Sequence, residues 1–166
     1  MLWLFRTHAS SGIFIVRVVL AMVMFAHGAQ KLLGWFGGQG FTGTIGFFTT
    51  SMGLPWIIAF LVIIGESIGS LSLLTGFLTR FVSASYLLIM LGAIALVHWP
   101  HGFFMNWFGQ QQGEGFEYHL LVIGMSLSLR VESGGASSLD HLIAKWTALR
   151  ERPGTPSLQP LAQGKH

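Results

Sequence analysis

Apolar residues gather into four long blocks along the chain, at about 12–33, 55–76, 80–98 and 116–131. A helix needs about 20 consecutive, predominantly apolar residues to cross the hydrocarbon layer of a membrane. The first three blocks meet that length, and the fourth is shorter. The pattern therefore predicts an all-α, polytopic membrane protein in which residues 1–132 form an antiparallel bundle of four transmembrane helices.

The first block has a rival interpretation as a cleaved signal peptide. Arg6 precedes the apolar run, and residues 26–29 are mostly small, as at a cleavage site. The run is nevertheless long enough to span, and three comparable segments follow it. Both observations favour a membrane span.

Two connectors, residues 34–54 and 99–115, are rich in glycine and aromatic residues. In the first connector, four apolar residues recur at helical spacing and predict a short helix against the membrane surface, with an aromatic-rich loop as the alternative. These residues are Phe41, Ile45, Phe48 and Met52. The second connector contains no Lys or Arg.

The C-terminal part differs in composition from the apolar blocks. Small residues at 133–138 predict a linker, and apolar positions at helical spacing within 139–152 predict a cytoplasmic amphipathic helix. The apolar positions are Leu139, Leu142, Ile143, Trp146 and Leu149. Asp140 in its first turn suits the helix dipole. This helix would lie on an anionic membrane face or bind a partner protein, and residues 153–166 are expected to be a flexible tail.

Composition supports the membrane class and narrows the chemistry. Charged residues make up 9% of the chain, against about 25% in soluble domains. The net charge of +3 rests on nine scattered Lys and Arg residues, which argues against a nucleic-acid surface. The chain has no cysteine, so thiol chemistry, iron–sulfur ligation and cysteine-type zinc sites are excluded.

The basic residues also predict the orientation. In the four-span topology eight of them fall on one side, and Lys31 falls on the other. The eight are Arg6, Arg17, Arg80, Arg130, Lys145, Arg150, Arg152 and Lys165. The positive-inside rule then puts both termini in the cytoplasm and both connectors outside. In this scheme Trp3 and Arg6 anchor the N-terminus at the interface, and Arg17 and Arg80 are topology anchors at the inner ends of their helices.

Polar residues inside the apolar blocks predict a site. His27, Gln30 and Lys31 share one helical face because they stand at i, i+3 and i+4. Glu66 lies near the middle of the second block. An ionisable group at that depth costs about 2.5–3.5 kcal/mol on insertion scales, so we expect Glu66 to be protonated or paired with Lys31 or Arg17.

Further polar residues gather toward the outer half of the predicted bundle. His98 ends the third block, and Glu117, Tyr118 and His119 begin the short fourth block, where they are expected to face the interior. Together with the first face and Glu66, they predict a ligand pocket beneath the aromatic connectors. We predict that Glu66 and His27 are catalytic and that the ligand contacts the following side chains: His27, Gln30, Lys31, Glu66, His98 and His119.

Packing signals lie on the second block as well. Gly65 and Gly69 form a small-xxx-small spacing that lets another helix approach closely.

Ordered motifs across about residues 12–129 resemble the DoxX/DoxD family of small four-helix membrane proteins. The motifs are Arg17 before Phe25-Ala-His27-Gly28-Ala-Gln-Lys31-Leu32, then Gly53-Leu-Pro55, Glu66-Ser-Ile-Gly69, Leu74-Thr-Gly76-Phe-Leu-Thr-Arg80 and His98. The resemblance implies a protein of the bacterial inner membrane, associated with quinone-linked respiration, sulfur oxidation or oxidative-stress complexes.

Three functions remain open from the sequence. The first is a quinone-binding subunit that receives electrons from a redox partner protein. The second is a haem- or copper-binding protein that uses His27, His98 and His119, with Met22 and Met24 nearby. The third is a non-catalytic assembly or chaperone subunit. The lipid membrane is an expected partner in each case, no nucleic acid is expected, and a homo-oligomer stays open.

Overall fold

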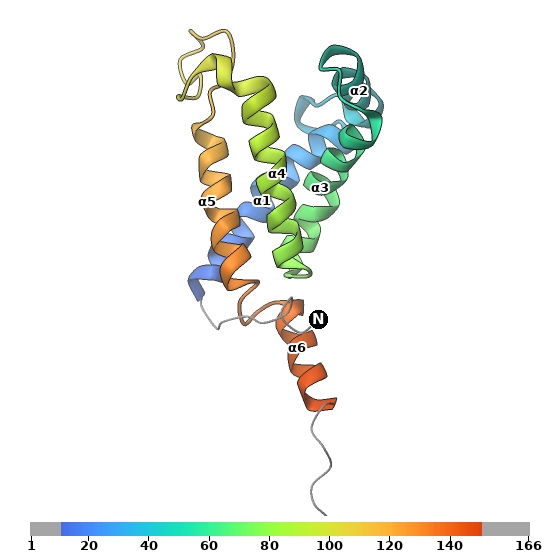
Figure 1. Ribbon diagram of the computed structural model, residues 1–166, viewed down its shortest axis with the longest axis vertical. Coiled ribbons are helices and arrows are strands. Elements are labelled where there is room, and N and C mark those ends of the chain that lie inside the picture. The colour runs from blue at the N-terminus through green and yellow to red at the C-terminus, as the bar shows by residue number, and fades with distance from the viewer. Residues whose placement is uncertain (1–10, 151–166) are drawn as a thin grey trace, which may run out of the picture.

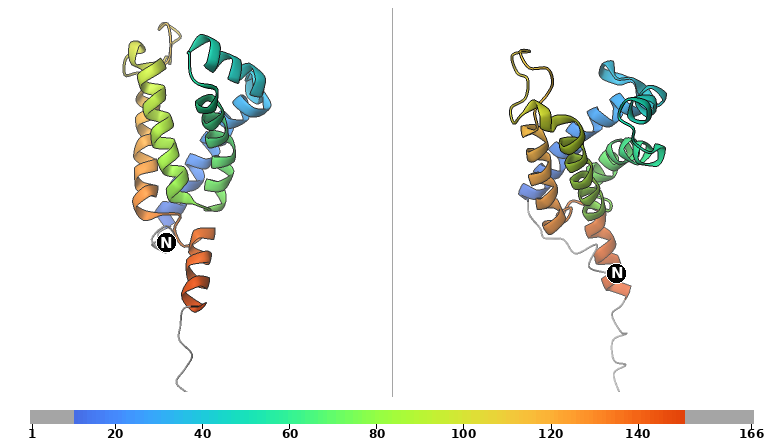
Figure 2. Two further views of the ribbon diagram at one scale, coloured as in Figure 1. Left: turned by 45° about the vertical axis from the view of Figure 1, so that its right-hand side comes forward. Right: turned by 45° about the horizontal axis from the view of Figure 1, so that its top comes forward.

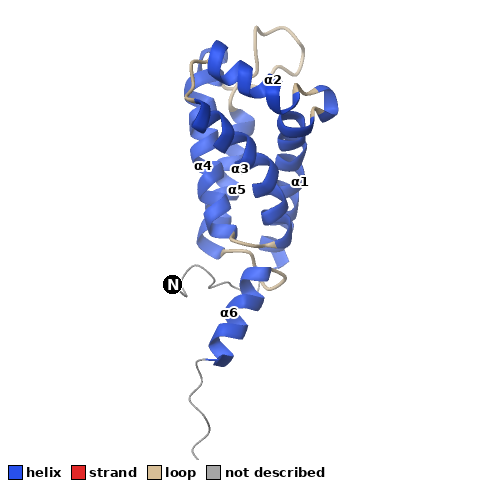
Figure 3. Cartoon of the chain, turned by 90° about the vertical axis from the view of Figure 1, so that its right-hand side faces the viewer, coloured by secondary structure: helices blue, strands red, loops and turns tan. Residues whose placement is uncertain are grey.

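The computed structural model describes residues 11–150, which form six α-helices and no strand (Figure 3). The helices are α1 Ser11–Leu33, α2 Gly40–Gly46, α3 Trp56–Thr75, α4 Thr79–Ala93, α5 Glu117–Glu132 and α6 Leu139–Arg150. The all-α prediction is therefore confirmed for this part of the chain. The predictions for Trp3, Arg6 and the tail 153–166 concern residues outside it.

Three helical segments are long and apolar enough to cross a membrane. They are α1, α3 and the segment Thr79–His101, in which α4 continues through a π-helical turn, Ile94–His98, and a 3₁₀ turn, Trp99–His101. The fourth apolar block forms α5, whose 16 residues span about 24 Å at 1.5 Å per residue.

Four of the helices pack together as one helical core, made of α1, α3, α4 and α5. Within it α1 packs against α3 and α5, and α4 packs against the same two helices. Successive core helices run in opposite directions, so the core has two distinct ends (Figure 1, Figure 2). The connector end carries α2 and the loop 102–116, and the α6 end carries the first residues of α1 and the start of α6.

The core is apolar on the inside, and much of its outer surface is apolar as well. Leu20, Tyr86 and Val122 are fully buried among other apolar side chains. In contrast, Leu88 and Leu121 are 74% and 67% exposed. Large apolar side chains on the outside of a long helix are the normal surface of a helix in lipid, because hydrocarbon is their solvent.

The backbones of α1 and α3 approach each other closely at Gly28. A Cβ atom added to Gly28 would lie 2.6 Å from the backbone of both Glu66 and Ser67. The Ser67 hydroxyl donates a hydrogen bond of 3.0 Å to the Gly28 carbonyl. The predicted stripe at Gly65 and Gly69 meets side chains of α4 instead, so the glycine that lies against a neighbouring helix backbone is Gly28, outside that stripe.

Arg17 lies near the α6 end of α1, and its side chain is buried against the end of α3. Its side chain is 1% exposed and donates from Nη1 to the carbonyls of Leu73 and Leu74, at 2.9 Å each. Its Nη2 donates to the Ser137 carbonyl at 2.7 Å. The last carbonyls of a helix have no partner within the helix and carry partial negative charge. Arg17 therefore caps the C-terminus of α3 and ties the 133–138 segment to it.

Arg80 makes a similar contact and is likewise buried. It is 7% exposed, and its Nη2 donates a 2.8 Å hydrogen bond to the carbonyl of Val131 in the last turn of α5. Arg17 and Arg80 thus each bond to the end of a neighbouring helix.

Asp140 lies in the first turn of the C-terminal helix, as predicted, and also contacts α4. Its buried carboxylate accepts hydrogen bonds of 2.8 Å from the backbone N–H groups of Leu78 and Thr79. Its own N–H donates to the Gly76 carbonyl at 3.0 Å. Asp140 thus supplies the N-terminal cap of α4, in addition to lying in the first turn of α6.

The segment 133–138 is packed against the core rather than acting as a free linker. Ser133 and Ser138 are buried, and Ser138 lies against Gly76 in the turn between α3 and α4. Gly76 has a positive φ of 70°, which suits glycine at a helix end. After this docked first turn, α6 projects away from the core (Figure 1).

Candidate functional site: a buried polar cluster

Lys31 and Glu66 form an ion pair between α1 and α3, with 2.5 Å between Nζ and Oε2. Their side chains are 22% and 5% exposed. Side chains lean toward the N-terminus of their own helix. Because α1 and α3 run in opposite directions, Lys31 and Glu66 lean toward each other, whereas Arg17 leans toward the α6 end.

The sequence left Lys31 and Arg17 as possible partners of Glu66, and the structure pairs Glu66 with Lys31. Arg17 is engaged by the carbonyls at the end of α3, and Lys31 is the residue that reaches the carboxylate. A buried carboxylate without such a partner would carry a large desolvation penalty. The pair therefore explains how Glu66 is accommodated in its charged form.

His27 lies one turn before Lys31 and is close enough to interact electrostatically with both Lys31 and Glu66. Its ring centroid is 5.5 Å from that of Tyr118. The Tyr118 hydroxyl donates to the Met24 sulfur at 3.8 Å. His27 and Tyr118 thus connect the ion pair to α5.

His98 and His119 pack against each other near the connector end in a tilted arrangement, with ring centroids 4.0 Å apart and ring planes inclined by 44°. The Nδ1 atom of His98 lies 2.8 Å from the Glu114 carbonyl oxygen. His119 is 6% exposed, and its Nδ1 has no hydrogen-bond partner within residues 11–150. The fold therefore brings together two histidines from different apolar blocks.

Gln30 lies apart from these groups, although the sequence assigned it to the same site. Its Nε2 donates to the Phe36 carbonyl at 3.3 Å, in the first connector. On a helix, Gln30 and Lys31 are separated by about 100°, since successive residues turn by that angle. Lys31 faces Glu66, so Gln30 faces the connector.

Glu117 also faces a connector, contrary to the expectation that it faces the interior. Its Oε1 accepts hydrogen bonds from the Met105 N–H at 2.9 Å and from the Trp107 Nε1–H at 2.8 Å. Both residues belong to the loop 102–116. Glu117 thus stabilises this loop, while the adjacent His119 enters the core.

Tyr86 is a member of the cluster that the sequence analysis missed. It is fully buried, its hydroxyl has no hydrogen-bond partner among the described residues, and it interacts electrostatically with Glu66. A tyrosine in the middle of an apolar block was the available signal, because a buried phenol normally requires a polar partner.

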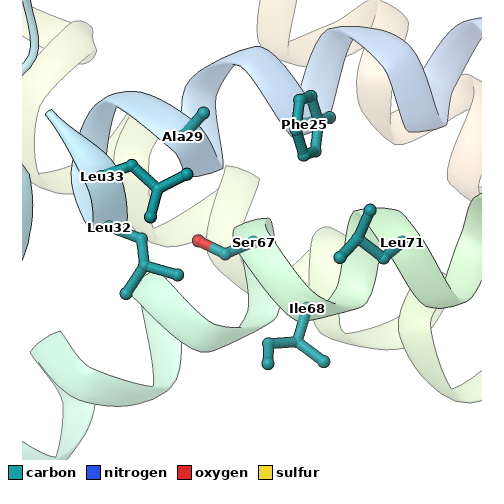
Figure 4. A pocket seen from close by; sticks show the side chains of 7 residues that line it. All are labelled: Phe25, Ala29, Leu32, Leu33, Ser67, Ile68 and Leu71. Atoms are coloured by element: carbon teal, nitrogen blue, oxygen red, sulfur yellow. The ribbon is translucent and has the colours of Figure 1, made fainter. Parts of the chain in front are cut away.

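A cavity of about 100 Å³ lies between α1 and α3, and Figure 4 shows the side chains around it. Its lining is apolar except for the Ser67 hydroxyl and consists of Phe25, Ala29, Leu32, Leu33, Ser67, Ile68 and Leu71. None of the predicted ligand-binding residues lines it. Typical ligand pockets measure about 300–1,000 Å³, so this cavity is too small for a drug-sized molecule.

The predicted metal ligands do not form a ready coordination site. Within residues 11–150, no group of three or more His, Cys, Asp and Glu side chains is arranged to hold a metal ion. Met22 is 61% exposed on the outer surface, whereas Met24 is buried and accepts the Tyr118 hydroxyl.

Comparisons with known proteins identify the family. The DoxX family model matches residues 12–99. A protein of Bacillus subtilis (strain 168) named "Putative oxidoreductase CatD" is 33% identical over 118 residues, which cover 71% of this chain and 78% of that protein. No solved structure matches the chain. With these two matches and helices of membrane-spanning length, the chain is a membrane protein that belongs to the DoxX family.

Proposed function

We propose that this protein crosses the bacterial inner membrane as an antiparallel bundle of four transmembrane helices with both termini in the cytoplasm. Two observations support the proposal. First, α5 packs against α4 and α1, so it completes the core despite its length. Second, Arg17 and Arg80 lie toward the α6 end, which is the end that the positive-inside rule assigns to the cytoplasm.

Cysteine labelling tests this topology, because the natural chain contains no cysteine. Gln111 lies in the loop at the connector end, and Lys145 lies on α6; both are exposed. In intact cells, an impermeant thiol reagent should label Gln111→Cys and should label Lys145→Cys only after the cells are opened. The reverse pattern would overturn the proposed orientation.

Within that membrane domain, we propose that the protein is a quinone-interacting subunit of a redox complex. The observation that carries the proposal is the buried polar cluster: an ion pair, Lys31–Glu66, beside His27, with the unpartnered Nδ1 of His119 toward the connector end. Convergent titratable groups in an apolar interior are a usual sign of a functional site. The name of the Bacillus subtilis relative agrees with an oxidoreductase function.

The donor set suits a quinone. A quinone carries two electrons and two protons between its oxidised and reduced forms. The unpartnered His119 Nδ1 and Tyr86 hydroxyl would hold carbonyl oxygens, and the Lys31 ammonium would stabilise negative charge on them. Glu66 and His27 would exchange protons with the bound oxygen atoms. Electrons would come from a partner protein.

A second candidate function is a non-catalytic assembly subunit, and the packing favours it. The Gly28 crossing closes α1 onto α3, Lys31 and Glu66 satisfy each other, and the cavity of about 100 Å³ lies outside the polar cluster. In this case the polar cluster would serve to fix the register of the helices.

One preparation distinguishes the two functions. The full-length protein is purified in a mild detergent, its visible spectrum is recorded, and bound quinones are extracted and identified by mass spectrometry. Wild-type protein should retain quinone, and folded Glu66→Gln and His27→Ala variants should lose most of it. His141→Gln, on α6 and outside the cluster, is the matched control and should retain quinone. If the wild-type protein contains no quinone and its folded variants still assemble a partner complex, the quinone proposal is rejected and the assembly function is retained.

A further inference from the structure

The titratable groups of the core extend from the connector end to the middle of the helices. His98 lies at the end of the π turn beside the loop 102–116, and His119 packs against it at 4.0 Å between ring centroids. The Tyr118 ring follows at 5.4 Å from His119 and at 5.5 Å from His27. His27 in turn neighbours the Lys31–Glu66 pair. The groups therefore form a continuous series.

A departure from α-helical geometry brings His98 and His119 together. The helix that begins as α4 changes to a π turn over Ile94–His98. The extra residue of a π turn shifts the direction of every later side chain by about 100°. His98 ends this turn and meets His119 on α5. Because π turns are frequently found at functional sites, this turn makes the two rings candidates for a functional role.

The hydrogen bond of His98 determines which of its nitrogen atoms can accept a proton. A carbonyl oxygen only accepts hydrogen bonds, so His98 Nδ1 carries the hydrogen that it donates to the Glu114 carbonyl at 2.8 Å. In the neutral ring the free lone pair is then on Nε2. Because Glu114 lies in the exposed part of the loop, this ring is held at the boundary between solvent and core.

His119 provides the next acceptor. It is 94% buried, since its exposed fraction is 6%, and its Nδ1 lacks a partner within the described residues. A buried polar atom without a partner is costly and rare in native proteins. An imidazole in this position has a ring nitrogen available to take up or release a proton, while His98 separates it from the solvent-exposed loop.

We propose that His98 and His119 form a proton-exchange site that connects the solvent at the connector end to the buried cluster around Glu66. A proton from water binds to His98 Nε2 and gives an imidazolium. His98 then turns this nitrogen toward His119, passes the proton to the unpartnered His119 Nδ1 and returns to its neutral form. His119 releases a proton from Nε2 toward His27, and the Glu66 carboxylate finally takes it up, so that all three histidines end neutral and one proton has moved inward.

Charged and titratable groups face this path from the core helices and from the connector. His27 and Lys31 come from α1, Glu66 from α3, Tyr86 from α4, and Tyr118 and Glu117 from α5. On the connector side, Glu114 and His101 flank His98, and the Glu117 carboxylate is bonded to Met105 and Trp107. The positive charge of Lys31 disfavours protonation of the His27 ring, and the negative charge of Glu66 favours it. A proton that reaches His27 is therefore directed toward the carboxylate. The inference concerns the protein without a bound quinone and goes beyond the proposed function.

The test follows the imidazole proton of His119 by nuclear magnetic resonance. The full-length protein is labelled at its histidine rings and placed in lipid nanodiscs. In wild type, a ring proton of His119 should exchange with water, and saturation transfer from the water signal measures the rate. A His119 ring that does not exchange its proton with water would overturn the proposal without any variant being needed.

Substitutions then separate proton transfer from simple packing. In His98→Gln, exchange of the His119 ring proton with water should slow by roughly tenfold or more, in line with the effect of a positioned acid–base group. His98→Glu should restore much of the rate, because a carboxylate also carries protons. His101→Gln, three positions later in the same connector, should leave the rate unchanged. A wild-type rate in folded His98→Gln, or equal slowing in His98→Gln and His98→Glu, would overturn the proposal.

Discussion

Lys31 Nζ lies 2.5 Å from Glu66 Oε2 across the interface of α1 and α3, although the two residues are 35 positions apart in the chain. The pair neutralises the only carboxylate that the second apolar block contains. Lys31 retains some exposure and Glu66 almost none, so the carboxylate depends more strongly on its partner than the ammonium does.

We predict that Glu66→Gln lowers the free energy of unfolding by about 2 kcal/mol, because removal of one member of a buried pair leaves the other uncompensated. This loss is smaller than the roughly 3–5 kcal/mol usual for breaking a buried pair, because Lys31 is 22% exposed. Thermal unfolding in detergent measures it. Adding Lys31→Met should recover part of the loss, whereas adding Arg17→Met should only add to it. Recovery with Arg17→Met instead would contradict the assigned pair.

Gly28→Ala should separate α1 from α3 at their crossing, because the new Cβ would lie 2.6 Å from backbone atoms of Glu66 and Ser67. Overpacking of this kind costs about 1–3 kcal/mol. The matched control is Gly124→Ala in α5, where an added Cβ has no neighbour within 4 Å; it should be neutral or slightly stabilising. Thermal unfolding of both variants provides the comparison, and equal stability would refute the close contact.

Asp140→Ala should release the first turn of α6 from the core. The carboxylate caps the N–H groups of Leu78 and Thr79, and the loss of such a cap costs about 0.5–2 kcal/mol. Hydrogen exchange should therefore accelerate at these two amides. Lys145→Gln alters an exposed charge on the same helix and should leave both amides protected. Unchanged protection in Asp140→Ala would show that another group holds the turn.

Arg17→Lys should weaken the α6 end despite the conserved charge. The guanidinium reaches three carbonyls with two nitrogen atoms, and an ammonium cannot reproduce this planar fork. The expected loss is about 2 kcal/mol, since hydrogen bonds from a charged donor contribute about 1.5–3 kcal/mol. Limited proteolysis should detect faster cleavage within residues 133–138. Wild-type resistance would mean that lysine satisfies the same carbonyls.

The sequence alone determined the helical class and the family. Helices lie at all four apolar blocks, because a backbone in lipid must satisfy its hydrogen bonds within its own segment. This requirement is local, so composition and block length suffice to locate the helices. The order of the motifs around Arg17, His27, Glu66 and His98 likewise sufficed to indicate the DoxX family, which the family model then matched.

The direction in which helical side chains lean also follows from the sequence, and it favours Lys31 as the partner of Glu66. In antiparallel neighbours, Lys31 on the first helix and Glu66 on the second must lean toward each other. Arg17 leans the other way, toward the carbonyls at the end of α3. The same geometry separates Gln30 from Lys31 by about 100°.

Only the tertiary structure decided the remaining contacts, because they depend on the register and spacing of helices that are distant in sequence. The π turn that brings His98 to His119 and the crossing at Gly28 leave no periodic signal. Asp140 satisfies a dipole rule within α6, yet its carboxylate caps α4. A local pattern specifies which backbone groups need partners, whereas the packing of the helices determines which side chains are close enough to provide them.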